Sequence, residues 1–206
     1  IGSVGVHAHG YSRETEDYDI PGFAWSSAAR NAAIEAGEEP DLARGSVANS
    51  DSETTGGAIG ASWFGEDVMV GLSWARHETN YGLPGPGEEP EDPLEEPEAI
   101  RIDQEQDRFD FSAEWSNPGG IIDNVLLRAA YNDYQHAELE GAEIGTLFEQ
   151  TGLDTRLHVG HAPVAGWAGT LGVQFTDTDL DAFGAEAYIP PSQTEALSLF
   201  LLERRR

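Results

Sequence analysis

The sequence contains no cysteine, which excludes disulfide scaffolds, thiolate zinc sites and cysteine nucleophiles. It also lacks any uninterrupted apolar run near the roughly 20 residues that a transmembrane helix needs. The longest apolar run, about residues 196–202, is interrupted by Ser198. A chain of this kind that crosses a membrane must therefore do so with strands.

Basic residues are scarce, with 11 Lys and Arg against 38 Asp and Glu, and the formal net charge is -27. This acidity argues against nucleic acid as a partner and against docking on anionic lipid, since both need basic surfaces. Hydrophobic residues make up 39% of the chain, which is low for a soluble core of this size. That fraction is ordinary where each strand gives one face to lipid and the other to water.

Apolar and polar residues alternate with a period of two along much of the chain, which predicts β-strands. Phe109, Phe111 and Trp115 fall on one face of such a segment, while Asp110 and Ser112 fall on the other. The predicted strands cover residues 4–13, 54–64, 68–77, 99–116, 124–138, 152–161, 167–178 and 194–203. The last is apolar on both faces, so its orientation stays open. A short helix is predicted at residues 27–36, with Ser26 or Ser27 as N-cap and Gly37 as its end.

The connections between these strands alternate in length. Short turns are expected at residues 65–67, 117–120 and 163–166, and long polar loops at 14–50, 82–98, 139–145 and 181–193. The aromatic residues follow the same division, with Trp63, Trp115 and Trp167 beside short turns and Tyr11, Tyr81 and Tyr134 nearer the long loops. Short turns at one end, long loops at the other and two aromatic girdles are typical of outer-membrane barrels.

The pattern predicts an all-β fold, namely a segment of about eight antiparallel strands from a transmembrane β-barrel. One alternative is a soluble or surface β-sandwich that binds a ligand through its long loops. It explains the individual strands but not the sorting of the loops. A second alternative is a small outer-membrane barrel enzyme. Neither a GxSxG nor an HExxH motif occurs, so we expect no enzymatic activity.

Several segments, in this order along the chain, resemble the barrel portion of the TonB-dependent outer-membrane receptors, in the branch that includes zinc and other metal-uptake receptors. They are YSRETEDYDIPGFA, NSDSETTGGAIGASWFG, NYGLPG, IRIDQEQDRFDFSAEW, LRAAYNDYQHAELEGAEIGTLF and LSLFLLERR. The resemblance implies a receptor in the cell outer membrane that imports a metal ion, a metal chelate such as a siderophore complex, or another scarce nutrient. Its expected partners are outer-membrane lipid and the TonB system, reached through a plug domain.

Receptors of this family enclose that plug in a barrel of about 22 strands. The TonB box, the plug and a final strand ending in an aromatic residue are all missing from these residues. Residues 1–206 are therefore expected to form a partial outer-membrane barrel domain, with the plug and the remaining strands outside it. No cofactor is expected, although a divalent cation is a candidate cargo.

Two groups of residues are candidates for binding such a cargo. The first is an acidic tract where related metal receptors often carry histidines; it consists of Glu88, Glu89, Glu91, Asp92, Glu95, Glu96 and Glu98. Carboxylates suit hard cations better than zinc, and the alternative is a solvated loop stiffened by proline. The second group is His77 and His136, predicted to face the lumen near the extracellular end. Together with a loop carboxylate they form a hypothetical metal site, the alternative being ordinary polar lumen residues.

Overall fold

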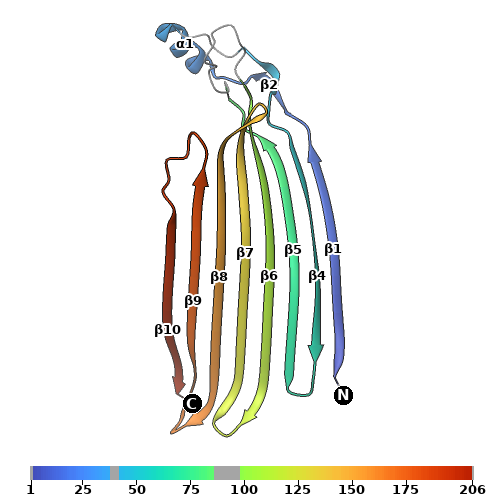
Figure 1. Cartoon of the computed structure of the whole chain (residues 1–206), viewed down its shortest axis with the longest axis vertical. Coiled ribbons are helices and arrows are strands. Elements are labelled where there is room, and N and C mark those ends of the chain that lie inside the picture. Colours follow the sequence, from blue (N-terminus) through green and yellow to red (C-terminus); the bar gives the residue numbers. More distant parts are fainter. Residues whose placement is uncertain (1, 38–41, 86–97, 206) are drawn as a thin grey trace.

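The computed structural model describes residues 2–37, 42–85 and 98–205. Their dominant feature is a single eight-stranded antiparallel sheet (Figure 1). Its strands, in spatial and in sequence order, are β1 (Ser3–Thr15), β4 (Ser52–Phe64), β5 (Val68–Gly82), β6 (Ile100–Gly119), β7 (Ile122–Glu140), β8 (Glu143–Val164), β9 (Trp167–Phe183) and β10 (Ser192–Arg205). The prediction of an all-β fold with eight antiparallel strands is confirmed. The central strands run longer than their alternating segments, and β8 exceeds its prediction most.

A small insertion lies between β1 and β4, at one end of the sheet (Figure 1). It holds a two-stranded sheet, β2 (Tyr18–Phe23) with β3 (Arg44–Val47), and the helix α1 (Ser27–Ala36). The predicted helix is confirmed together with its ends, since the Ser26 hydroxyl accepts a hydrogen bond from the backbone N–H of Ala29 and Gly37 takes a left-handed φ of 84°. The small sheet was not predicted, because its strands are too short to show a period. Within the described ranges, no helix is long and apolar enough to cross a membrane.

The register gives the large sheet two chemically different faces. Leu72 lies opposite Phe111, and Phe111 lies opposite Ala129, so apolar side chains line up across the strands. The resulting surface, here called the apolar band, consists of Val4, Val6, Ala8, Ile59, Ala61, Trp63, Val68, Val70, Leu72, Trp74, Phe109, Phe111, Ala113, Trp115, Val125, Leu127, Ala129, Tyr131, Leu153, Thr155, Leu157, Val159, Leu171, Val173, Phe175, Leu197, Leu199 and Leu201. The predicted facing of Phe109, Phe111 and Trp115, opposite to that of Asp110 and Ser112, is confirmed. The open question for β10 is also answered, because Leu197, Leu199 and Leu201 join the band.

Nothing in the described part of the chain covers the apolar band. Leu72 is 64% exposed and Leu199 75% exposed, and the strands contact only their neighbours within the sheet. The buried hydrophobic residues among those described are Ala33 and Ile102, and neither belongs to the band. A soluble β-sandwich needs a second sheet over this face, and these residues contain none.

The connections between strands follow the prediction of short turns at one end of the sheet and long loops at the other, with one correction. The connection predicted as a long loop at residues 139–145 is a tight turn, because Glu140 pairs with Glu143 and only Gly141 and Ala142 lie between the strands. The polar run there continues the strands, and Gly141 supplies the positive φ that the turn needs. The hairpin turn at Ala165 and Gly166 likewise has two positive φ values, which match the twist of paired strands.

The tyrosines lie toward the long-loop end as predicted, but they do not form an aromatic girdle on the apolar face. Tyr11 and Tyr134 belong to the face opposite the apolar band, as does Tyr81. The tryptophans Trp63, Trp115 and Trp167 do lie on the apolar face next to the short turns. At the other limit of the band, the aromatic residues are Trp74, Phe109 and Tyr131, which the register aligns.

The sheet is open. In the described ranges β1 pairs only with β4, and β10 pairs only with β9, so the outer edge of each is unpaired. Residues 4–12 and 197–203 therefore form no hydrogen-bonded ladder with each other. These two strands lie at opposite sides of the sheet (Figure 1).

Candidate ligand-binding face

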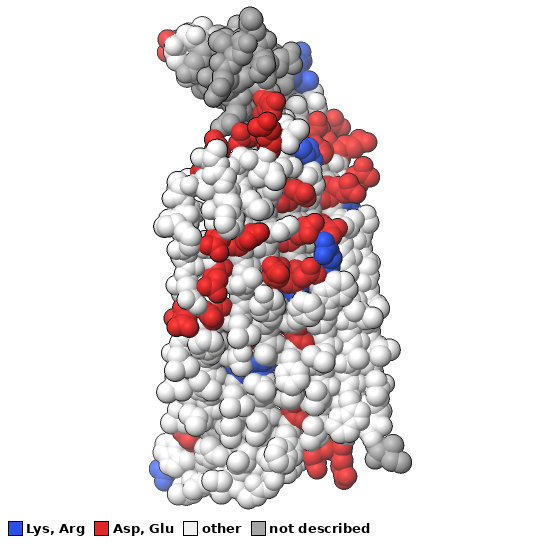
Figure 2. All heavy atoms as spheres, in the orientation of Figure 1, with Lys and Arg blue, Asp and Glu red and all other residues white. Residues whose placement is uncertain are grey.

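Acidic side chains gather on the same face as the apolar band, immediately beyond it toward the end that carries the insertion. This acidic belt consists of Glu14, Glu53, Glu78, Asp103, Glu105, Asp107, Asp133, Glu149, Asp177, Asp179, Asp181 and Glu195. Figure 2 shows acidic side chains crowded over the upper part of the sheet, above a broad area with few charges. Twelve of the 38 acidic side chains of the chain thus lie together on one face.

Arg76 neutralises part of this belt. Its guanidinium forms ion pairs with Glu78, with Glu105 at 3.0 Å and with Asp107 at 3.0 Å. The indole Nε1–H of Trp74 donates to the Asp107 carboxylate at 2.7 Å. The boundary between the apolar band and the acidic belt is therefore fixed by direct contacts.

The opposite face, here called the polar face, carries mainly neutral hydrogen-bonding and aromatic side chains at this height. The Tyr11 hydroxyl lies 2.7 Å from Nδ1 of His77, and the two rings come together across Gly56. A Cβ on Gly56 would lie 2.6 Å from Cζ of Tyr11 and 2.9 Å from the carbonyl oxygen of Arg76. Glycine is thus required at this position for the tyrosine to reach the histidine.

A second neutral group lies further across the polar face. The amide Nε2 of Gln106 donates to Oδ1 of Asn132 at 2.5 Å. Tyr134 and His136 are joined by a 3.0 Å contact between Oη and Nδ1, and the His136 ring stacks on Phe148 with centroids 4.5 Å apart. Burial lowers the pKa of His136, and the charge of Glu138 opposes that shift only in part. Burial therefore favours the neutral form of this imidazole.

The two predicted metal-binding histidines share the polar face but do not share a site. His77 lies on β5 and His136 on β7, with Gln104 and Gln106 of β6 between them. Each ring is already engaged by an aromatic neighbour. In the part of the chain that the structure describes, no three His, Asp or Glu side chains are grouped so as to hold a metal ion.

The acidic tract is placed only in part. Glu88, Glu89, Glu91, Asp92, Glu95 and Glu96 lie outside the described residues. Glu98 is described and exposed, and its carboxylate lies against Gly141 in the turn between β7 and β8, where a Cβ would overlap it. The prediction that the tract binds cations stays a prediction.

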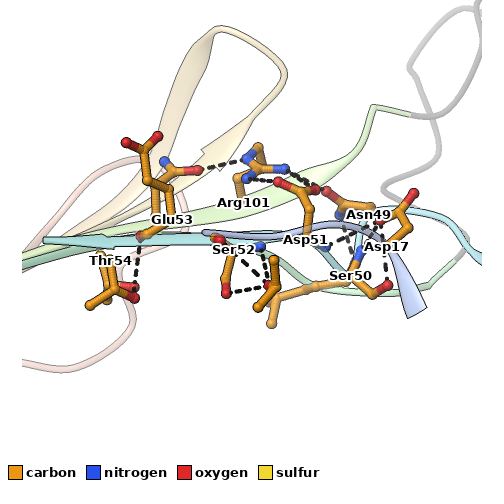
Figure 3. A network of polar contacts seen from close by, with 12 residues as sticks. Asp17, Asn49, Ser50, Asp51, Ser52, Glu53, Thr54 and Arg101 are labelled. Carbon is orange, nitrogen blue, oxygen red and sulfur yellow. Dashed lines mark hydrogen bonds and ion pairs between the residues drawn. The ribbon is translucent and has the colours of Figure 1, made fainter. Parts of the chain in front are cut away.

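A polar network that the sequence analysis missed attaches the insertion to the sheet (Figure 3). The Asp17 carboxylate accepts from the backbone N–H groups of Ser50 and Asp51 at 2.8 and 3.1 Å. Arg101 donates to both oxygens of Asp51 at 2.9 and 2.8 Å, and this pairing holds the pKa of Asp51 below its usual value. Asn49, with a φ of 56°, donates to the backbone carbonyl of Leu83, just after β5, and to that of Ile100, at the start of β6.

This network borders a pocket of about 360 Å³ at the mouth of the polar face. Its lining includes Arg13, Ser50, His77, Thr79 and Tyr81, so the insertion and the sheet both contribute. The run of Asn, Ser and Asp at residues 49–52 is typical of a turn. It was the one sequence signal for the network that attaches the insertion to the sheet.

A comparison of the sequence with protein-family models finds no match.

Proposed function

We propose that this chain forms part of the wall of an outer-membrane β-barrel receptor, which imports a scarce nutrient under the control of the TonB system. The observation that carries the proposal is the apolar band. It is exposed on one face of a sheet whose other face is polar, with tryptophans at its short-turn limit and the acidic belt at the other.

The dimensions of the band support lipid as its covering. From Phe109 to Trp115 the backbone advances about 20 Å at ~3.4 Å per residue. The indole rings of Trp74 and Trp115, at the two limits of the apolar band, add to this backbone length. The height of the band thus approaches the roughly 25 Å apolar height of outer-membrane barrels. Exposure within the band reaches 80% for Val6, and soluble monomers rarely leave so continuous an apolar surface in water.

The open edges support a larger closed barrel. Backbone N–H and C=O groups at the outer edges of β1 and β10 have no partners in the described residues. Inside hydrocarbon such groups cost several kcal/mol each, so a spanning sheet must close on itself. Further strands that continue both edges satisfy this requirement, and the polar face then surrounds an aqueous interior.

The receptor assignment is supported by the resemblance of the strand and loop segments to the TonB-dependent family. The polar face supplies hydrogen-bonding and aromatic side chains around Tyr11, His77 and Tyr134, near the mouth that the insertion borders. The mechanism is binding followed by gated passage, with no chemical step. A metal ion, a metal chelate or another scarce nutrient is the cargo, and a plug outside these residues couples transport to TonB.

Tryptophan fluorescence tests the membrane assignment. Trp63, Trp74, Trp115 and Trp167 lie on the apolar face, whereas Trp25 lies between β2 and α1. In vesicles of brominated lipid, a full-length variant that retains only Trp115 should be strongly quenched. A matched variant that retains only Trp25 should be quenched little. Equal quenching of the two variants contradicts the lipid-facing band.

Transport is tested in cells. A strain that lacks the full-length gene should grow more slowly when a metal or chelate is limiting, and the gene should restore growth only when TonB is intact. Restoration without TonB contradicts the energy-coupled mechanism even if the membrane assignment holds.

A further inference from the structure

Two arginines face each other on the polar face below the histidines. Arg128 of β7 is directly opposite Arg156 of β8 in the register. Like charges in directly opposite positions destabilise a sheet. The chain has 38 acidic side chains, yet none of those described forms an ion pair with either arginine.

The neighbouring charged groups are already engaged. Arg108 holds Asp110 through contacts of 2.8 to 3.2 Å, and the Asp154 carboxylate accepts from Gln174 at 2.7 Å. The Arg156 guanidinium lies 4.9 Å from the centre of the Phe200 ring. Of the three arginines Arg108, Arg128 and Arg156, Arg128 is the one that has no such partner among the described residues.

Arg128 borders a hollow of about 460 Å³ between β6, β7 and β8. The lining includes the small residue Ala130 and the carboxylates Asp110 and Asp154, and Ser112 lies directly opposite Arg128. Volumes of 300 to 1,000 Å³ are typical of small-molecule sites. The space is thus large enough for a ligand group and has a hydroxyl and a guanidinium beside each other.

We infer that this hollow binds a carboxylate or phosphate group of an anionic cargo, with Arg128 as the residue that contacts it. The planar guanidinium fork matches both groups in geometry and charge. In the lining, Arg108 and Arg128 balance Asp110 and Asp154, and Arg156, directly opposite Arg128, adds one positive charge beside the hollow. The inference rests on the proposed function, since the polar face must line the aqueous passage, and it favours an anionic chelate over a bare cation as cargo.

The charge distribution supports this choice. The acidic belt lies on the other face of the sheet, where it cannot concentrate cations for the passage. Arg128 lies on the opposite face, where cargo would travel.

The test is calorimetric titration of the full-length protein in vesicles with citrate and with inorganic phosphate, at constant ionic strength. The unmodified protein should bind at least one of them, and Arg128→Gln should weaken that binding at least about tenfold. Arg128→Lys, which keeps the charge without the fork, should give an intermediate loss. Arg204→Gln is the matched control, because Arg204 is exposed on the polar face of β10 away from the hollow.

The absence of binding by either anion, or an equal loss in the Arg204→Gln variant, overturns the inference. Each variant is first checked by lipid quenching of tryptophan, and Ser112→Ala serves as the second variant if Arg128→Gln does not insert. A protein that inserts but binds no anion disproves only this site. A protein that binds anion through Arg128 but shows no lipid quenching disproves the membrane assignment instead.

Discussion

Replacing Leu72 by arginine should destabilise the protein in a bilayer by about 2–4 kcal/mol, because this side chain lies near the middle of the apolar band. The neighbouring substitution Ser73→Arg is the control. Ser73 points to the polar face, between Gly60 and Asp110 in the register, so the new charge meets space and a carboxylate. We expect its effect to stay within about 0.5 kcal/mol, as for an ordinary surface change.

A third variant separates a membrane from a soluble core. Val68 belongs to the same face as Leu72 but lies at the short-turn end of β5. An arginine there can extend its charge to the interface, so Val68→Arg should cost only about 0–1 kcal/mol. The cost should therefore depend on depth along the strand, whereas a soluble core would penalise each site according to its packing.

The assay is reversible urea unfolding of the full-length protein from lipid vesicles, followed by tryptophan fluorescence. A loss of 2–4 kcal/mol corresponds to a roughly 30- to 1,000-fold change in the unfolding equilibrium constant, which such curves resolve easily. Equal costs for Leu72→Arg and Ser73→Arg, or for Leu72→Arg and Val68→Arg, would refute the assignment of the apolar band to lipid.

Further predictions concern the insertion, the polar face and the acidic belt. Arg101→Gln removes the partly exposed ion pair with Asp51, which contributes about 0.2–1 kcal/mol to stability. Because this ion pair attaches the insertion to the sheet, protease cleavage within residues 16–51 should accelerate while the sheet stays protected. Because the folded pKa of Asp51 is lowered, the same loosening should appear in the unmodified protein as pH falls through that pKa, below about 4. Since the folded pKa of His136 is lowered, its contribution to stability is present above about pH 6.5 and lost as pH falls; His136→Gln should remove that part of the pH dependence of urea unfolding. Gly56→Ala should displace the Tyr11 ring and abolish its hydrogen bond with His77, seen as a changed chemical shift of the His77 ring in NMR spectra, while an unchanged shift would contradict the close approach. Acidic side chains of the belt lie directly opposite each other on neighbouring strands, as Glu78 does with Glu105, and salt screens their repulsion. Raising the salt concentration should therefore stabilise the protein, and stability that is independent of salt would count against that repulsion.

The strands and their facing were predictable because the signal is local and repeated. In β6, each second residue from Phe109 to Trp115 is apolar or small, and a slip of one residue would turn the whole set to the wrong face. Strand β10 gave no such signal, since Phe200 and Leu202 interrupt the alternation, and only pairing with β9 defines its faces. The turn at Gly141 was mistaken for a loop because polar residues there continue the pairing beyond the apolar band.

The candidate site was less predictable, because alternation specifies a face and an approximate height but not lateral separation. His77 and His136 were correctly placed on one face, yet a whole strand separates them. The network around Arg101 depends on contacts between positions far apart in sequence, including Asn49 and Asn80. A pattern with a period of two contains no information about such contacts.

The order of the strands also has a consequence for how the sheet forms. Apart from β1 with β4, every pairing in the large sheet joins strands that are consecutive in the chain. Hairpins of this kind close early, because the entropy lost in closing a loop grows with its length. The pairing of β1 with β4 must instead close across residues 16–51. Pairing of β2 with β3 brings the ends of that loop closer together, so we expect variants that unfold the insertion to slow the pairing of β1 with β4.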